Sequence, residues 1–115
     1  MGKKALFAFN GELMCFVHVL LNALDMDAKG ENVKIVFEGA STALIPQLAQ
    51  KQNPFHQLYA ESREKGLVAG ACKACSAKMQ VLDDVIAQDI SLLDNMNGHP
   101  SISEFQDKGY MILTF

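Results

Sequence analysis

The chain has 115 residues, of which 50% are hydrophobic and 20% are charged, and its formal net charge is -3. This length and composition fit one folded domain with a core of its own, which we expect to cover residues 1–115, and they exclude an intrinsically disordered chain. The small negative charge and the absence of a dense Lys/Arg cluster exclude the electrostatic pattern of a nucleic-acid-binding protein.

The N-terminal region lacks the pattern of a targeting segment. The apolar run Ala5–Phe9 is interrupted by Asn10–Glu12, no cleavage site of small residues follows, and Leu6 replaces the hydroxyl residue of a myristoylation signal. The longest apolar stretch, Leu13–Leu24, is shorter than the roughly 20 residues that span a bilayer. We therefore expect a soluble, cytoplasmic protein that does not associate with a membrane.

Strands and helices are expected to alternate along the chain. Runs rich in β-branched and aromatic residues predict strands, and segments of helical length and composition predict helices, several of which end at a glycine. The strands are expected at Lys4–Phe9, Val33–Phe37, Leu67–Ala71, Ser91–Asp94 and Tyr110–Phe115. The helices are expected at Leu13–Lys29, Ser41–Lys51, Phe55–Lys65, Cys72–Met79, Leu82–Ala87 and Ser101–Lys108.

Hydroxyl side chains are expected to cap two of these helices, because a side-chain oxygen can accept a hydrogen bond from a free backbone N–H of the first turn. Ser41 or Thr42 precedes the second helix, in which Pro46 marks either a kink or a later start. Ser101 or Ser103 precedes the last helix.

The alternation of strands and helices is typical of βαβ units. It predicts the α/β class, with a parallel sheet and helices on both of its faces. In such a sheet, ligands and chemistry collect beyond the carboxyl ends of the strands. Three loops are expected there, at Asn10–Cys15, Glu38–Thr42 and Ala71–Cys75, so all three cysteines should lie at one edge of the sheet.

Cys72 and Cys75 are the candidate catalytic residues. They follow the apolar run Leu67–Ala71 at a strand-to-helix junction, and their spacing of one helical turn allows both sulfurs to face one pocket. A cysteine in the first turn of a helix lies at the positive end of the helix dipole, and Lys73 adds a cation, so we expect a stabilised thiolate. Such a pair can hold sulfur as a persulfide, cycle between dithiol and disulfide, or provide half of a zinc site.

Cys15 has two interpretations. It is either a small apolar residue of the first helix or a third thiol at the sheet edge. In the second case a zinc site could contain Cys15, Cys72 and Cys75, with Glu12, His18 or His99 as a fourth ligand. If the loop that contains His99 folds over the same edge, this histidine could also tune the pKa of a cysteine.

The first helix is apolar in nearly every direction, whereas a helix that covers one face of a small sheet normally shows a polar stripe. The apolar residues are Leu13, Met14, Phe16, Val17, Val19, Leu20, Leu21, Ala23, Leu24 and Met26. We expect a second copy of the chain to cover this helix in a homo-oligomer. The alternative is a helix that neighbouring elements of its own chain cover in part.

Four segments together resemble the DsrE/DsrF-like family, and the resemblance spans nearly the whole chain. The segments are Ala5–Glu12, Val68–Cys75, Gly98–Ser101 and Gly109–Phe115. The resemblance implies a three-layer α/β/α domain with a five-stranded parallel sheet in the order 4-3-2-1-5. It also implies assembly as a trimer or hexamer.

The same resemblance implies a sulfur-transfer protein and not an enzyme with a small-molecule product. Better-understood members carry a persulfide on a cysteine that follows the third strand, and Cys72 matches that position. Cys75 would then resolve the persulfide or complete a redox pair. The implied partners are proteins that donate or accept sulfur, and no cofactor is expected. A metal or redox module built from Cys15, Cys72 and Cys75, and a structural oligomer that binds a small ligand, remain as alternatives.

Overall fold

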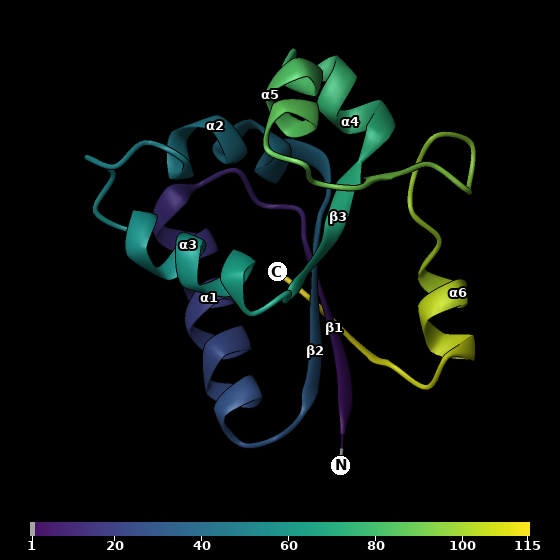
Figure 1. Cartoon of the computed structure of the whole chain (residues 1–115). Coiled ribbons are helices and arrows are strands. Elements are labelled where there is room, and N and C mark those ends of the chain that lie inside the picture. The colour runs from purple at the N-terminus through teal and green to yellow at the C-terminus, as the bar shows by residue number, and fades with distance from the viewer. Residues whose placement is uncertain (1) are drawn as a thin grey trace.

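The computed structural model describes residues 2–115, so Met1 of the expected domain 1–115 lies outside the described residues. Within this range one sheet contains five parallel strands in the order β4-β3-β2-β1-β5 (Figure 1). The strands are β1 (Lys3–Ala8), β2 (Asn32–Phe37), β3 (Val68–Cys72), β4 (Leu92–Leu93) and β5 (Met111–Thr114). The expected α/β class and the strand order implied by the resemblance are confirmed.

Helices occupy every connection between these strands. They are α1 (Leu13–Ala28), the 3-10 helix η1 (Gly39–Ala43), α2 (Leu44–Leu48), α3 (His56–Glu64), α4 (Lys73–Lys78), α5 (Leu82–Ala87) and α6 (Ile102–Asp107). Each expected strand and helix has a counterpart with bounds that shift by a few residues, but the segment expected as one helix from Ser41 to Lys51 contains the end of η1 and the shorter α2. None of the helices formed by residues 2–115 has both the length and the apolar character that crossing a bilayer requires.

The connection after β2 begins with a tight 3-10 turn in place of the capped α-helix that the sequence predicts. Ser41 and Thr42 lie inside this turn and are fully buried, while Glu38 occupies the N-cap position. The Ser41 hydroxyl donates a hydrogen bond of 2.6 Å to the Ala8 carbonyl oxygen, which ties η1 to the end of β1. Pro46 lies in the first turn of α2, where the backbone N–H groups have no hydrogen-bond acceptor within the helix, so the missing N–H of proline costs no hydrogen bond. The expected later start of the helix is confirmed.

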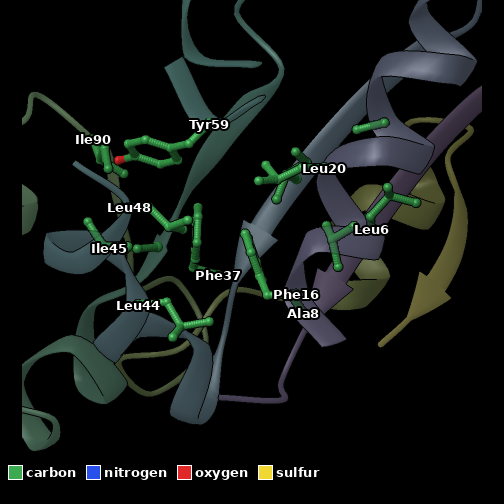
Figure 2. Packing of buried hydrophobic residues seen from close by; sticks show 14 of the residues in the cluster. Leu6, Ala8, Phe16, Leu20, Phe37, Leu44, Ile45, Leu48, Tyr59 and Ile90 are labelled. Atoms are coloured by element: carbon green, nitrogen blue, oxygen red, sulfur yellow. The ribbon is translucent and has the colours of Figure 1, made fainter. Parts of the chain in front are cut away.

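The larger core lies between the sheet and the helices α1, α2, α3 and α5 (Figures 1 and 2). Leu6 and Ala8 of β1 face this core, and the Phe16 ring of α1 stacks on the Phe37 ring of β2 with 4.9 Å between their centroids. Each large apolar side chain buried here contributes roughly 1.5–3 kcal/mol. This layer therefore supplies most of the apolar burial that holds β2 and β3 in place.

The opposite face of the sheet is covered by α6, which Figure 1 shows apart from the other helices. Phe7 of β1 points to this side because successive residues of a strand face opposite ways. Its ring meets that of Phe105 edge-on, with 5.3 Å between the centroids. The Ser101 hydroxyl accepts a hydrogen bond of 3.3 Å from the Glu104 backbone N–H, which confirms the expected cap of the last helix. The domain thus has three layers, with outer layers of unequal size.

Within this chain α1 is buried along one arc only. The buried residues are Phe16, Val17, Val19, Leu20 and Ala23. At about 100° per residue, the exposed residues Met14, Cys15, His18, Leu21 and Asn22 fall on the opposite side. The exposed stripe therefore mixes apolar and polar side chains, and the expected cover by a second copy stays a prediction.

Candidate functional site

Cys72 is the last residue of β3 and the N-cap of α4, one residue before the helix in which the sequence places it. Its sulfur accepts a hydrogen bond of 3.3 Å from the Cys75 backbone N–H. The strand can reach this point beside β4 because Gly70 has no side chain. A Cβ atom at Gly70 would lie 2.6 Å from the Ser91 carbonyl oxygen. The small residues of β3 thus allow close packing around the site.

Four side chains within the described residues converge beyond the carboxyl ends of β2 and β3. They are Glu38, Cys72, Cys75 and His99, and their donor atoms all lie within 4.8 Å of one another. His99 Nδ1 is 3.1 Å from Cys72 Sγ and 3.8 Å from Cys75 Sγ. Glu38 Oε1 is 3.9 Å from both Cys75 Sγ and His99 Nδ1. The expected convergence at this edge is thus found for two of the three cysteines.

A two-residue turn brings His99 to the cysteines. Asn97 and Gly98 have φ angles of 51° and 88°, as the two central residues of a type I′ hairpin turn require. Across this turn Met96 and His99 exchange backbone hydrogen bonds of 2.8 and 2.9 Å, and the Gly98 carbonyl oxygen accepts one of 2.9 Å from the Ala74 N–H. In Figure 1 this loop is the yellow-green segment that leads to α6. The loop therefore folds over the edge of the sheet and brings His99 to the cysteines, as the expected role of His99 requires.

Glu38 is the residue of this cluster that sequence reasoning missed. It follows β2 directly, and its backbone N–H donates a hydrogen bond of 2.8 Å to the Ala8 carbonyl oxygen. Its side chain is 9% exposed. Among residues 2–115, the His99 imidazole is the one basic group within 4 Å of its carboxylate. Its position in the sequence could have identified it, because an acidic residue directly after a parallel strand lies at the edge of the sheet where ligands bind.

Cys72 is a neutral thiol in this arrangement. Burial raises the pKa of the Cys72 thiol to about 12; the Cys75 backbone N–H lowers this pKa, while the Cys75 thiol and the Glu38 carboxylate raise it. The Lys73 ammonium lies 3.7 Å from Asp94 in an exposed ion pair. The expected thiolate with a lowered pKa is therefore wrong for Cys72, because desolvation outweighs the effect of the helix terminus.

Cys15 lies outside the cluster that the described residues form. It is exposed in the first turn of α1, whereas Phe16 beside it points into the core. Successive helix residues differ by about 100° in direction, so the burial of Phe16 turns Cys15 away from the sheet edge. The residues that join the two other cysteines are Glu38 and His99, in place of Cys15 and of Glu12 or His18.

A hollow of about 520 Å³ opens beside the cluster, on the side of Glu38. Phe9, Met96 and Pro100 line it together with the first residues of α6. Phe9 and Met96 are 41% and 49% exposed, so the rim of the hollow is partly apolar. Glu38 is the member of the cluster that lines this hollow.

The chain is similar to known proteins over most of its length. The model of the DsrE/DsrF-like family matches residues 5–115, a range that includes all four residues of the cluster. The uncharacterized protein MJ0733 of Methanocaldococcus jannaschii is 27% identical over 97 residues, which cover 84% of this chain and 77% of that protein. No solved structure matches the chain significantly.

Proposed function

Because the chain belongs to the DsrE/DsrF-like family, we propose that it is a cytoplasmic sulfur carrier that holds a persulfide on Cys72. One observation carries this proposal: Cys72 ends β3 with its sulfur 3.1 Å from a histidine nitrogen. A nucleophile within hydrogen-bond reach of a base is the arrangement that covalent transfer chemistry needs. The partners are proteins that donate or accept sulfur.

His99 is the base in this proposal. In the tautomer that carries its proton on Nε2, His99 accepts the proton of the neutral Cys72 thiol at Nδ1, 3.1 Å from the sulfur. The thiolate forms when this proton moves to the imidazole. The resulting thiolate and imidazolium have opposite charges at close range, and their attraction offsets the desolvation that favours the neutral thiol. The Glu38 carboxylate, 3.9 Å from the same nitrogen, adds a second negative charge beside the imidazolium.

Loading with sulfur is an exchange between sulfur atoms without net oxidation. The Cys72 thiolate attacks the outer sulfur of a donor persulfide, so that a new S–S bond forms on Cys72 as the donor S–S bond breaks. The donor leaves as a thiolate and takes the proton that His99 holds. Delivery is the reverse reaction, in which an acceptor thiolate attacks the outer sulfur and Cys72 regains its proton.

Cys75 is the auxiliary thiol of the pair. It is less buried than Cys72, and its sulfur lies 3.8 Å from the same His99 nitrogen. A Cys75 thiolate that attacks the inner sulfur of the Cys72 persulfide forms a Cys72–Cys75 disulfide and releases hydrosulfide. A dithiol reductant must then cleave this disulfide before Cys72 accepts sulfur again.

The proposal is tested by loading metal-free protein with a polysulfide donor and measuring intact mass, followed by peptide mapping. We expect wild type to gain one sulfur on the peptide that contains Cys72, and Cys72→Ser to gain none there. Cys15→Ser is the matched control, because this exposed thiol lies outside the cluster and its loss should leave loading of Cys72 unchanged. Equal stable loading of the same peptide in Cys72→Ser would contradict the assignment.

A further inference from the structure

We infer that Glu38, Cys72, Cys75 and His99 form a binding site for a zinc ion. The four ligand atoms are one carboxylate oxygen, two thiolate sulfurs and His99 Nδ1, and they all lie within 4.8 Å of one another. This inference concerns metal binding and does not depend on the proposed sulfur transfer.

The distances between the four atoms suit a tetrahedral ion. Zinc lies about 2.3 Å from sulfur and about 2.0–2.2 Å from nitrogen or oxygen, so the ligand atoms of a tetrahedral site lie roughly 3.3–3.8 Å apart. The separations of 3.1 and 3.8 Å between His99 Nδ1 and the two sulfurs are close to this range. The two separations of 3.9 Å from Glu38 Oε1 are close to it as well. Shifts of less than about 1 Å would therefore complete the coordination.

The charge of Glu38 is a second observation in favour of a cation. Its side chain is nine-tenths buried, and a buried carboxylate is costly unless a positive charge or strong hydrogen bonds accompany it. Among the described residues its contacts at the site are a thiol and an imidazole, both at 3.9 Å. A divalent ion between these groups supplies the positive charge that the carboxylate lacks.

The type of ligand selects the metal. Thiolate sulfur and imidazole nitrogen favour zinc over magnesium and calcium, which prefer oxygen. Four protein ligands fill a tetrahedral shell, as in structural zinc sites, and leave no open position for a substrate.

The backbone holds the four ligands in place before a metal arrives. Cys72 and Cys75 flank the start of α4, and η1 follows Glu38 directly. His99 lies on the hairpin turn, and the Gly98 carbonyl oxygen of this turn accepts a hydrogen bond from the Ala74 backbone N–H. Such preorganisation reduces the ordering that binding would otherwise require.

Zinc and a persulfide would exclude each other, because both use the sulfur of Cys72. This consequence, unlike metal binding itself, rests on the proposed function. It makes zinc-loaded protein a form that accepts no sulfur.

The test begins with full-length wild type purified without chelator and kept reduced with a phosphine. Elemental analysis should find one zinc per chain, and metal-free protein should take up one equivalent of Zn²⁺ in competition with a chromophoric chelator. Co²⁺ in place of Zn²⁺ should give an intense thiolate-to-cobalt charge-transfer band and the visible bands of a tetrahedral ion. Wild type that binds neither ion stoichiometrically would overturn the inference, whatever the variants do.

Variants identify the ligands. His99→Ala and Glu38→Gln should each weaken zinc binding, His99→Ala by at least about 100-fold, while Cys15→Ser should bind as wild type does. Circular dichroism checks that each variant is folded. Zinc binding that is lost in Cys15→Ser and kept in folded His99→Ala would refute this ligand set.

The two proposals fail independently, because sulfur loading is measured on metal-free protein and zinc binding without a sulfur donor. Stoichiometric zinc together with an unloaded Cys72 would refute the carrier and keep the metal site. A loaded Cys72 in protein that binds no zinc would refute the metal site and keep the carrier.

Discussion

At the scale of single residues, the site places a buried neutral thiol beside a partly exposed base. Cys72 is fully buried, whereas the His99 side chain is 41% exposed. In the proposed carrier, this burial would shield a sulfur atom on Cys72 from water and from small reductants. The same burial makes the thiolate costly, so the chemistry depends on a proton acceptor in contact with the sulfur.

Replacing His99 by alanine tests this dependence. We expect His99→Ala to slow the sulfur loading of metal-free protein by about 100-fold, because general-base catalysis contributes at least that much in enzymes. Added imidazole should restore part of the rate, since it can accept the proton from the space that the side chain leaves. Stopped-flow or quenched loading followed by mass spectrometry measures the rate. An unchanged rate, or a slow rate that imidazole does not raise, would show that His99 is not the base.

At the scale of elements, sequence reasoning succeeded wherever the signal was local. The apolar runs predicted the five strands, and the segments of helical composition predicted the α-helices but not the 3-10 turn η1. The spacing of Cys72 and Cys75 placed both at the start of α4. The role of Glu38 is not local, because it depends on β2 lying beside β3. The raised pKa of Cys72 depends on its burial and on neighbours such as Glu38, which no pattern in residues 67–79 contains.

The hydrogen bonds between α3 and Gln88, the residue that follows α5, offer a test of how burial affects a titrating group. The hydroxyl of Tyr59 donates a hydrogen bond to the side-chain oxygen of Gln88. The guanidinium of Arg63 donates one to the backbone carbonyl oxygen of Gln88. Burial raises the pKa of Tyr59 above 10, although Arg63 opposes this shift. The folded protein therefore binds the phenolic proton more tightly than the unfolded chain does.

This linkage predicts a loss of stability at high pH. The contribution of the Tyr59 proton is fully present below about pH 10 and is lost as pH rises from there through the raised pKa of the folded state. Urea denaturation of wild type and Tyr59→Phe across this range measures the effect. The difference in their free energy of unfolding should stay constant below about pH 9 and then shift against wild type. A difference that remains constant up to about pH 11 would contradict the raised pKa.

At the scale of the whole molecule, the exposed apolar residues of α1 favour a homo-oligomer. Met14 and Leu21 are 65% and 46% exposed on the outer stripe of the helix. We propose that a second copy covers this stripe, in the trimer or hexamer that the family resemblance implied. The sequence predicted that α1 is apolar, but not which of its sides is buried. That side is set by the packing of Phe16 and its neighbours against the sheet, which the sequence of the helix alone does not contain.

Two substitutions on α1 separate assembly from folding. Leu21→Asp should dissociate the oligomer and leave a folded monomer, because its side chain lies outside the core of the single chain. Val17→Asp should unfold the chain itself, because Val17 is 6% exposed and a charge there would be buried without a partner. Sedimentation velocity and circular dichroism measure the two effects. Wild type that sediments as a monomer at micromolar concentration would contradict the proposed oligomer.

The most direct test of the sulfur carrier is a transfer reaction followed by mass spectrometry under non-reducing conditions. Cys15→Ser protein is loaded from a donor that contains a heavy sulfur isotope, freed of donor, and mixed with an acceptor thiol. We expect the heavy sulfur to appear first on the Cys72 peptide and then on the acceptor. The amount that the acceptor gains should equal the amount that the Cys72 peptide loses. Heavy sulfur that resides on Cys75 alone, or that never leaves Cys72 for the acceptor, would contradict a carrier role for Cys72.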